Sequence, residues 1–482
     1  MFACFYTRPT KKQFVLLFLA AFIIRATMFF FFIQHTQRFN RYRQPDSADY
    51  HNGAVCLAYG NGMSQPGNNN PIFWRTPGYP LYLSIFYHLY GLKSGAFEAN
   101  ETAQKAALWV QIFVCSFIPI ILFYLAYLLT SSYVIAWLTA WISVCHIGFI
   151  LASTFLLTEG LAVIFFYLFL LFFLRLLINP KKQNYPNILL VMAMLSMYTW
   201  IRPMGEFVAI LSTAMLIIFG QHSWKKNIRD ALLFFGSFFI TLLPWYIRNY
   251  RLTGTWFFCP LSGVYLNVFC APKILRRTTE MNLHQAWQYC SQQAALATQQ
   301  ATQALRGTGM LPSPLISKQL AVPILCAYPL YFMFDWVKEV CKTTFDLYAY
   351  QLIAIAKGSF HYDPLEEFLT EKLAECLWTQ PAPLWIRTIC WAECAFSIVV
   401  WIGLIAGAWK FFFKTFFVQH ITDEQKNIRW IWLLCGIIIG AVISMTGGFG
   451  YARLRLPIEP LMLILSVMFW YTLFTKKRTN NL

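Results

Sequence analysis

The chain has 482 residues, of which 58% are hydrophobic and only 12% are charged. Soluble domains carry about 25% charged residues, so this composition excludes an ordinary soluble protein. The formal charge of +18 does not require a nucleic-acid partner, because the basic residues of a membrane protein gather in its cytoplasmic connections and meet anionic lipid there. The sequence therefore predicts a polytopic membrane protein.

The first apolar run, residues 13–34, follows Arg8, Lys11 and Lys12 and is longer than a signal-peptide core. It has no small-residue cleavage site, so we expect a retained signal anchor that starts in the cytoplasm. Similar runs, each long enough to cross about 30 Å of hydrocarbon, recur along the chain. We predict an all-α protein with about ten transmembrane helices, at residues 13–34, 105–129, 132–151, 160–177, 187–201, 205–220, 231–247, 388–409, 430–446 and 457–475.

Two further apolar and aromatic stretches, residues 77–92 and 321–336, are each 16 residues long and are interrupted by proline or polar residues. Such lengths favour interfacial or re-entrant helices over full crossings. If both stretches crossed, the total would rise from ten to twelve without changing the side on which either terminus lies. The sequence leaves these two counts open.

Basic residues concentrate in the segments that this arrangement places inside, which predicts that both termini are cytoplasmic. Two large regions then face outward, a first outer loop at residues 35–103 and a cap region at residues 248–387. The cap includes a polar helical stretch rich in Gln and Ala. We therefore divide the chain into an N-terminal transmembrane module (1–247), the extracytoplasmic cap, and C-terminal transmembrane helices (388–482).

Ionisable residues outside the cytoplasmic flanks collect at this outer face. The acids are Asp46 and Asp49 in the first outer loop, and Glu159 and Glu459 at helix starts. Helix-end electrostatics can explain single charges at helix ends. Arginine in a short outer loop, however, opposes the bias that the other loops obey, so we expect a function to require it. The arginines of this layer are Arg75, Arg202, Arg248, Arg453 and Arg455.

Carboxylates and arginines together at headgroup depth suit the transfer of a group from a lipid-linked phosphate. The guanidinium fork matches phosphate and keeps its charge at any accessible pH. A sugar phosphate carries a leaving group that needs no protonation, so one carboxylate suffices as the base for an acceptor hydroxyl. Arginines would stabilise the charge that grows on the departing phosphate.

The same residues lie in short motifs that resemble those of the C-type glycosyltransferase (GT-C) superfamily. These integral membrane enzymes use polyprenyl-phosphate sugars, and they include protein O-mannosyltransferases of glycosyltransferase family 39 and lipid A aminoarabinose transferases. The resemblance spans most of the chain. It rests on DSADY from Asp46, RTPGYP from Arg75, Thr158-Glu159, Arg202-Pro203, PWYIRN from Pro244, and RLRLPIEP from Arg453.

The resemblance implies inversion at the anomeric carbon and a catalytic aspartate in the first outer loop. Asp46 matches that position best, but the family commonly has Asp-Glu there, whereas this chain has Ser47 next and a second acid at Asp49. Which carboxylate is the base therefore stays open, with Asp46 favoured. Glu159 would orient donor or acceptor. The residues implied at the donor phosphate are Arg75, Arg202, Arg248, Arg453 and Arg455, supported by Tyr50, Tyr79, Trp245, Asn249 and Glu459.

Alternatives to this enzyme are a transporter or flippase of lipid-linked saccharide, and a structural membrane protein whose arginines bind headgroups. A transporter should carry charged residues near the bilayer midplane, and few are present. A divalent ion could be held by Asp46, Asp49 and Glu159, although no fixed ligand spacing indicates one. We expect a bacterial inner membrane, a site facing the periplasm, a polyprenyl-phosphate sugar donor and membrane lipid as partners. The sugar, the acceptor and the choice between undecaprenyl and dolichyl carrier stay open.

Overall fold

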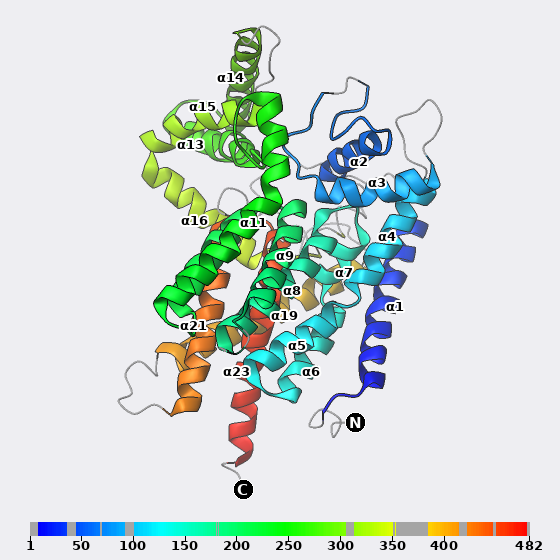
Figure 1. Cartoon of the computed structure of the whole chain (residues 1–482), viewed down its shortest axis with the longest axis vertical. Coiled ribbons are helices and arrows are strands. Elements are labelled where there is room, and N and C mark those ends of the chain that lie inside the picture. Colours follow the sequence, from blue (N-terminus) through cyan, green and yellow to red (C-terminus); the bar gives the residue numbers. More distant parts are fainter. Residues whose placement is uncertain are drawn as a thin grey trace.

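The computed structural model describes residues 8–35, 45–67, 70–91, 101–179, 181, 183–304, 313–349, 352, 384–413, 422–446 and 450–479. The regular elements of the described part are all helices, and its only β-type pairing is an isolated bridge between Ser64 and Pro71. The prediction of an all-α membrane fold is therefore confirmed. Figure 1 shows that the first helix begins and the last helix ends at the same end of the molecule.

Each predicted span is helical in the structure. Seven described helices are long and apolar enough to cross a membrane, or up to nine if each of two bent pairs is one span. Two of the predicted spans, α9 and α10, are apolar but shorter. The helices are α1 (Lys11–His35), α4 (Glu101–Cys115), α5 (Ile118–Thr130), α6 (Tyr133–Cys145), α7 (Ile147–Thr154), α8 (Thr158–Ile178), α9 (Tyr185–Ile201), α10 (Gly205–Phe219), α11 (Trp224–Thr253), α19 (Leu384–Ala408), α21 (Asp423–Ser444) and α23 (Glu459–Thr479).

Two of the predicted single helices are divided, although α4 and α5 together still count as one of the seven spans, Glu101–Thr130. The run predicted at 105–129 is divided into α4 and α5, and Pro119 occupies the first turn of α5, where its missing N–H is tolerated. The run predicted at 132–151 bends by 51° between α6 and α7. His146 is extended at that break, with φ −67° and ψ 115°. Helical hydropathy alone does not reveal such a break, because both halves remain apolar.

The central helices of the bundle are α8 and α23. In their apolar windows 67% and 78% of the residues are buried, against 22% in α1. Both central helices carry residues of the predicted site at their N-terminal ends, Glu159 on α8 and the segment before α23. That segment consists of α22 (Ala452–Arg455) and a short 3-10 turn, η7 (Leu456–Ile458).

The first outer region contains α2 (Pro45–Ala58) and α3 (Gly78–Tyr90), which lie across the outer ends of α1 and α4 in Figure 1. A Cβ at Gly78 would lie 2.6 Å from the carbonyl oxygen of Trp200, so only glycine allows this approach of α3 to α9. The Thr76 hydroxyl also donates a 2.7 Å hydrogen bond to the Ile201 carbonyl. The first outer region is thereby fixed to the end of α9.

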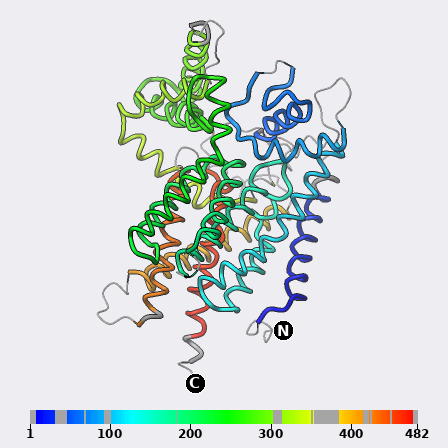
Figure 2. The backbone as a smooth tube through the Cα atoms, viewed as in Figure 1, coloured from blue at the N-terminus to red at the C-terminus, as the bar shows by residue number. Residues whose placement is uncertain are grey.

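The cap stands at the end of the molecule opposite the termini, as Figures 1 and 2 show. The polar stretch predicted within it forms α14, and the apolar stretch at 321–336 is shared by α15 and α16, which meet at a bend of 108°. Residues 305–312, 350, 351 and 353–383 of the predicted cap lie outside the described residues. The cap elements are α12 (Leu261–Val264), the π-helical η4 (Tyr265–Cys270), α13 (Ala271–Thr278), α14 (Leu283–Ala304), α15 (Ser313–Ala327) and α16 (Pro329–Phe345).

Candidate active site

A polar pocket lies where the first turn of α8, the end of α9 and α22 meet α2 and the start of the cap. Its volume is about 50 Å³ as the side chains stand, which is room for water rather than for a sugar phosphate. Three arginines and two carboxylates lie among its lining residues. The lining is Asp46, Tyr50, Trp74, Arg75, Thr76, Thr158, Glu159, Ile201, Arg202, Pro203, Cys259, Leu261, Tyr265, Tyr451, Arg453 and Leu454.

Asp46 lies in the first turn of α2, directly after Pro45, and its carboxylate is held between two guanidiniums. Arg75 Nη2 is 2.7 Å from Asp46 Oδ1, and Arg453 Nη2 is 2.6 Å from Asp46 Oδ2. Burial raises the pKa of the Asp46 carboxyl, but the charges of Arg453 and Arg75 outweigh burial and hold that pKa well below its ordinary 3.8. Asp46 is therefore ionised at any physiological pH.

Asp49 lies one turn further along α2 and contacts the same arginine from its other edge. Arg75 Nε donates to Asp49 Oδ2 at 3.0 Å, and Trp74 Nε1 donates to the same oxygen at 3.2 Å. The guanidinium of Arg75 also stacks over the ring of Tyr50, 5.1 Å from its centroid. Asp49 does not line the pocket. It orients Arg75, while Asp46 faces the cavity.

Glu159 brings a second carboxylate to the pocket from the first turn of α8, where the helix dipole favours it. Its Oε1 lies 3.3 Å from Arg202 Nη1 and 3.8 Å from Arg453 Nη1. The Thr158 hydroxyl donates to Glu159 Oε2. Arg202 Nη1 is buried without a hydrogen-bond partner, although it lies near this carboxylate. The Nη1 group of Arg202 is therefore available to donate a hydrogen bond to an anion in the pocket.

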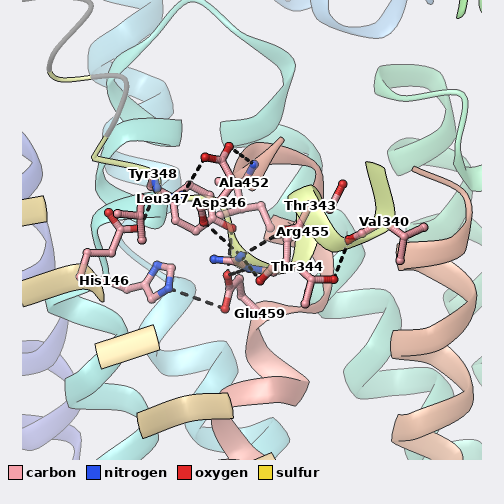
Figure 3. Close-up of polar contacts among 12 residues, drawn as sticks. His146, Val340, Thr343, Thr344, Asp346, Leu347, Tyr348, Ala452, Arg455 and Glu459 are labelled. Atoms are coloured by element: carbon pink, nitrogen blue, oxygen red, sulfur yellow. Dashed lines mark hydrogen bonds and ion pairs between the residues drawn. The ribbon is translucent and has the colours of Figure 1, made fainter. Parts of the chain in front are cut away.

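Arg455 and Glu459, predicted in the same site, form a separate buried cluster (Figure 3). Arg455 Nε donates to Glu459 Oε1 at 2.6 Å, and Arg455 Nη1 donates to the carbonyls of Thr343, Thr344 and Asp346. The Tyr348 hydroxyl donates to Glu459 Oε1 at 3.0 Å. Both charged side chains are only 4% exposed. This cluster joins the end of α16 to the start of α23 and does not line the pocket.

Four other predicted residues lie beside the pocket in a scaffolding network. Arg248 donates to the carbonyls of Met63 and Ile72 in the first outer region, and its guanidinium stacks on Trp245 at 4.3 Å. The remaining three bond to neighbouring loops and helices: Trp245 to Phe258 O, Asn249 to Phe257 O and Phe258 O, and Tyr79 to Gln111 Oε1. These contacts hold the loops around the pocket in place.

The sequence left open whether the site holds a divalent ion. Among the described residues, no group of three or more His, Cys, Asp or Glu side chains is arranged to hold a metal ion. Asp46, Asp49 and Glu159 instead face guanidiniums. Sequence reasoning missed three aromatic lining residues. Trp74 could have been found from its place beside Arg75, but Tyr265 and Tyr451 carry no sequence signal, because they come from the cap and from the loop before α22.

Comparison with known proteins finds similarity in solved structures. Neither a family model nor a curated protein matches the sequence. The oligosaccharyltransferase AglB from Archaeoglobus fulgidus, solved with an inhibitory peptide and a dolichol-phosphate, is 12% identical, with a TM-score of 0.49 over 98% of this chain and 51% of AglB. A second structure of the Archaeoglobus fulgidus oligosaccharyltransferase, tethered to an acceptor peptide, is 12% identical, with a TM-score of 0.46 over 97% of this chain and 50% of that one.

ArnT from Cupriavidus metallidurans, solved with undecaprenyl phosphate, is 12% identical, with a TM-score of 0.33 over 95% of this chain and 78% of ArnT. The chain thus spans about half the length of the oligosaccharyltransferases. All three TM-scores are below 0.5, so the function proposed below rests on the side chains of the site.

Proposed function

We propose that this chain is an inverting glycosyltransferase that moves a sugar from a polyprenyl-phosphate donor to a hydroxyl group outside the cytoplasm. The observation that carries the proposal is the carboxylate of Asp46, which is held between Arg75 and Arg453 in a pocket that also contains Arg202. The proposed base and the guanidiniums proposed to bind the phosphate therefore lie next to each other in one pocket. The motif resemblance supports the same reaction.

In the proposed step, Asp46 takes the proton of the acceptor hydroxyl as its oxygen attacks the anomeric carbon. The bond from that carbon to the phosphate oxygen breaks, and the polyprenyl phosphate leaves with the electron pair. Arg453 and Arg202 stabilise the growing charge on the phosphate. Attack from the face opposite the leaving phosphate inverts the anomeric centre.

The pairing of Asp46 with Arg75 and Arg453 also explains why Asp46 does not act as a base before the donor binds. Both oxygens of Asp46 are paired with guanidiniums in the structure, and the cavity is too small for a sugar phosphate. A phosphate that enters competes with Asp46 for the same arginines, because guanidinium binds phosphate and carboxylate in the same bidentate geometry. Donor binding would thereby enlarge the pocket and release the carboxylate to act as a base.

The test is Asp46→Asn. With the purified full chain in proteoliposomes, we expect release of undecaprenyl phosphate from a panel of undecaprenyl-phosphate sugars, with a membrane extract as acceptor, to fall about 10²- to 10⁴-fold. The amide cannot take the proton, but its size leaves the pocket filled. Donor binding should persist, because the phosphate-binding arginines remain.

The matched control is Asp49→Asn, which changes the neighbouring acid on the same helix. Asp49 bonds Trp74 and the outer edge of Arg75, so we expect a loss of about tenfold or less, in line with one weakened orienting contact. A wild-type rate for Asp46→Asn would refute the assigned base. A larger loss for Asp49→Asn than for Asp46→Asn would move the role to Asp49.

A further inference from the structure

Helix α16 has its polarity reversed relative to a helix that faces water. Its buried face carries Asp335, Glu339, Lys342 and Thr343, at spacings of four, seven and eight residues from Asp335. A helix on the surface of a water-soluble domain has the opposite arrangement, with the apolar stripe inside. The exposed residues are mostly apolar, namely Leu330 (79%), Met333 (59%), Phe334 (62%), Val337 (50%) and Phe345 (53%), while Tyr331, Lys338 and Cys341 are also exposed.

The buried charges fix the rotation of α16 about its axis. Glu339 accepts from Lys273 Nζ at 2.5 Å, from Lys342 Nζ at 3.2 Å and from the Gly450 backbone N–H at 2.8 Å. Arg277 Nη2 pairs with Asp335 Oδ1 at 2.6 Å. Turning the apolar face inward would break all of these contacts and leave the charges buried without partners. The apolar face of α16 is therefore held outward.

The surroundings of this face indicate hydrocarbon. The last residue of α16, Phe345, packs against Trp401 of α19, at 5.3 Å between ring centroids. On α19, Ile402 and Ile405 are 48% and 66% exposed, as expected for a transmembrane helix that faces lipid. The apolar surface of α19 thus meets the exposed face of α16 at its lower end.

The other end of α16 has the residues of a membrane–water boundary. Tyr328 and Tyr331 are 41% and 44% exposed there, and the Arg277 guanidinium lies 5.0 Å from the ring centroid of Phe334. Tyrosine rings and cations are enriched at headgroup depth. Figure 1 shows α16 running from the cap down to the helical bundle, along the direction that these residues predict.

We propose that α16 lies in the outer leaflet, with its apolar face (Leu330, Met333, Phe334, Val337 and Phe345) covered by lipid acyl chains. The cap is then seated on the bilayer instead of standing free above it. Helix α15 packs against the cap elements α12 and α14, and the two helices meet at 108°, so the pair enters the leaflet without crossing it. This proposal does not depend on the proposed function.

Photocrosslinking of the full chain tests the proposal. p-Benzoylphenylalanine replaces Phe334, and the protein is reconstituted in vesicles of phosphatidylcholine and phosphatidylglycerol. After irradiation, we expect mass spectrometry to find the mass of one phospholipid added to the peptide that contains residue 334. The matched control places the same group at Tyr289 on α14, an aromatic residue that is also exposed (42%) on the cap. We expect at least a fivefold lower lipid yield there.

Three outcomes would overturn the proposal: equal lipid yields at residues 334 and 289, a covalent dimer of the chain at residue 334, or an adduct between residue 334 and another part of the same chain. Position 330 carries the same expectation, so substitution of Leu330 repeats the test if the variant at 334 does not fold. Crosslinking reads lipid contact directly, so its result is separate from any loss of sugar transfer.

Discussion

Arg453 and Arg455 are separated by a single residue, but Arg453 lines the pocket and Arg455 is buried in a separate cluster. Arg453 lies in the pocket, 22% exposed, and contacts Asp46, which is 29% exposed. Arg455 and its partner Glu459 are each 4% exposed, and three backbone carbonyls accept from the same guanidinium. The Nε and Nη1 donors of Arg455 are thus used by buried protein groups and are not available to a ligand. The arginine of the site therefore differs from the arginine of the scaffold in how far its hydrogen-bond donors are already used by the protein, and not in residue type.

The geometry of α22 produces this division. Successive residues of a helix are about 100° apart, so Arg453 and Arg455 point about 200° apart. Arg453 is thereby directed to α2, and Arg455 to the end of α16. The backbone just before them is fixed from the cap, because the Ala452 N–H donates to Asp346 Oδ2 at 2.9 Å and the Gly450 N–H donates to Glu339.

Alanine substitutions of Arg455 and Arg453 should produce two different defects. Arg455→Ala leaves Glu459 buried without its cation, so we expect the free energy of unfolding to fall by about 3–5 kcal/mol. Arg453→Ala removes one donor to the leaving phosphate, so we expect the rate of sugar transfer to fall about 10²- to 10³-fold while the protein stays folded. Thermal unfolding in detergent and transfer by the purified protein measure the two effects.

The contrast fails if both variants unfold alike, or if Arg455→Ala stays stable and loses only activity. In the second case Arg455 would belong to the donor site, as the sequence predicts.

Lysine substitutions should sharpen the same contrast with smaller effects. Lysine keeps the charge but loses the guanidinium fork. In Arg455→Lys the ammonium cannot reach Glu459 and all three carbonyls together, so we expect a loss of about 1–3 kcal/mol in unfolding free energy. Arg453→Lys can still attract a phosphate, so we expect about a tenfold loss of rate, as for one charge-assisted hydrogen bond. Equal unfolding temperatures of wild type and Arg455→Lys would show that the carbonyl contacts contribute nothing.

The sequence was sufficient for the all-α class and for much of the pocket. Apolar runs predict where the helices lie, because the length of a helix that crosses hydrocarbon is fixed by the bilayer, but they do not predict the bend between α6 and α7 or the number of spans. The placement of Asp46, Arg75, Glu159, Arg202 and Arg453 on the outer face also predicts that they can meet, and the structure brings all five to one pocket.

Other features required the structure, because they depend on directions that a linear pattern does not contain. The motif that contains Arg453 and Arg455 reads as one unit, and only the short helix α22 sends the two side chains apart. The motif resemblance implies Arg248 at the donor phosphate just as it does Arg453, yet Arg248 bonds backbone carbonyls. The reversed polarity of α16 is invisible to hydropathy averaged over a window, because its charged and apolar faces are averaged together.

The smallest expected effect concerns pH, and it tests whether Arg453 acts on Asp46 as the contact implies. Because the pKa of Asp46 lies below its ordinary 3.8 in the folded protein, its ion pairs stabilise the fold fully above that value and are lost as the pH falls through the lower, folded pKa. Between pH 5 and 8 we therefore expect kcat/KM of the wild type to show no acidic limb from Asp46.

Removing Arg453 takes away one of the two charges that depress this pKa, so Arg453→Ala should move the acidic limb of kcat/KM to higher pH. The matched control, Arg455→Lys, leaves both partners of Asp46 in place and should leave the limb unmoved. Rates measured from pH 4 to 8 for the three proteins decide the matter. A wild-type limb near pH 6, or the same shift in both variants, would mean that the group titrating in catalysis is not Asp46 as Arg453 holds it.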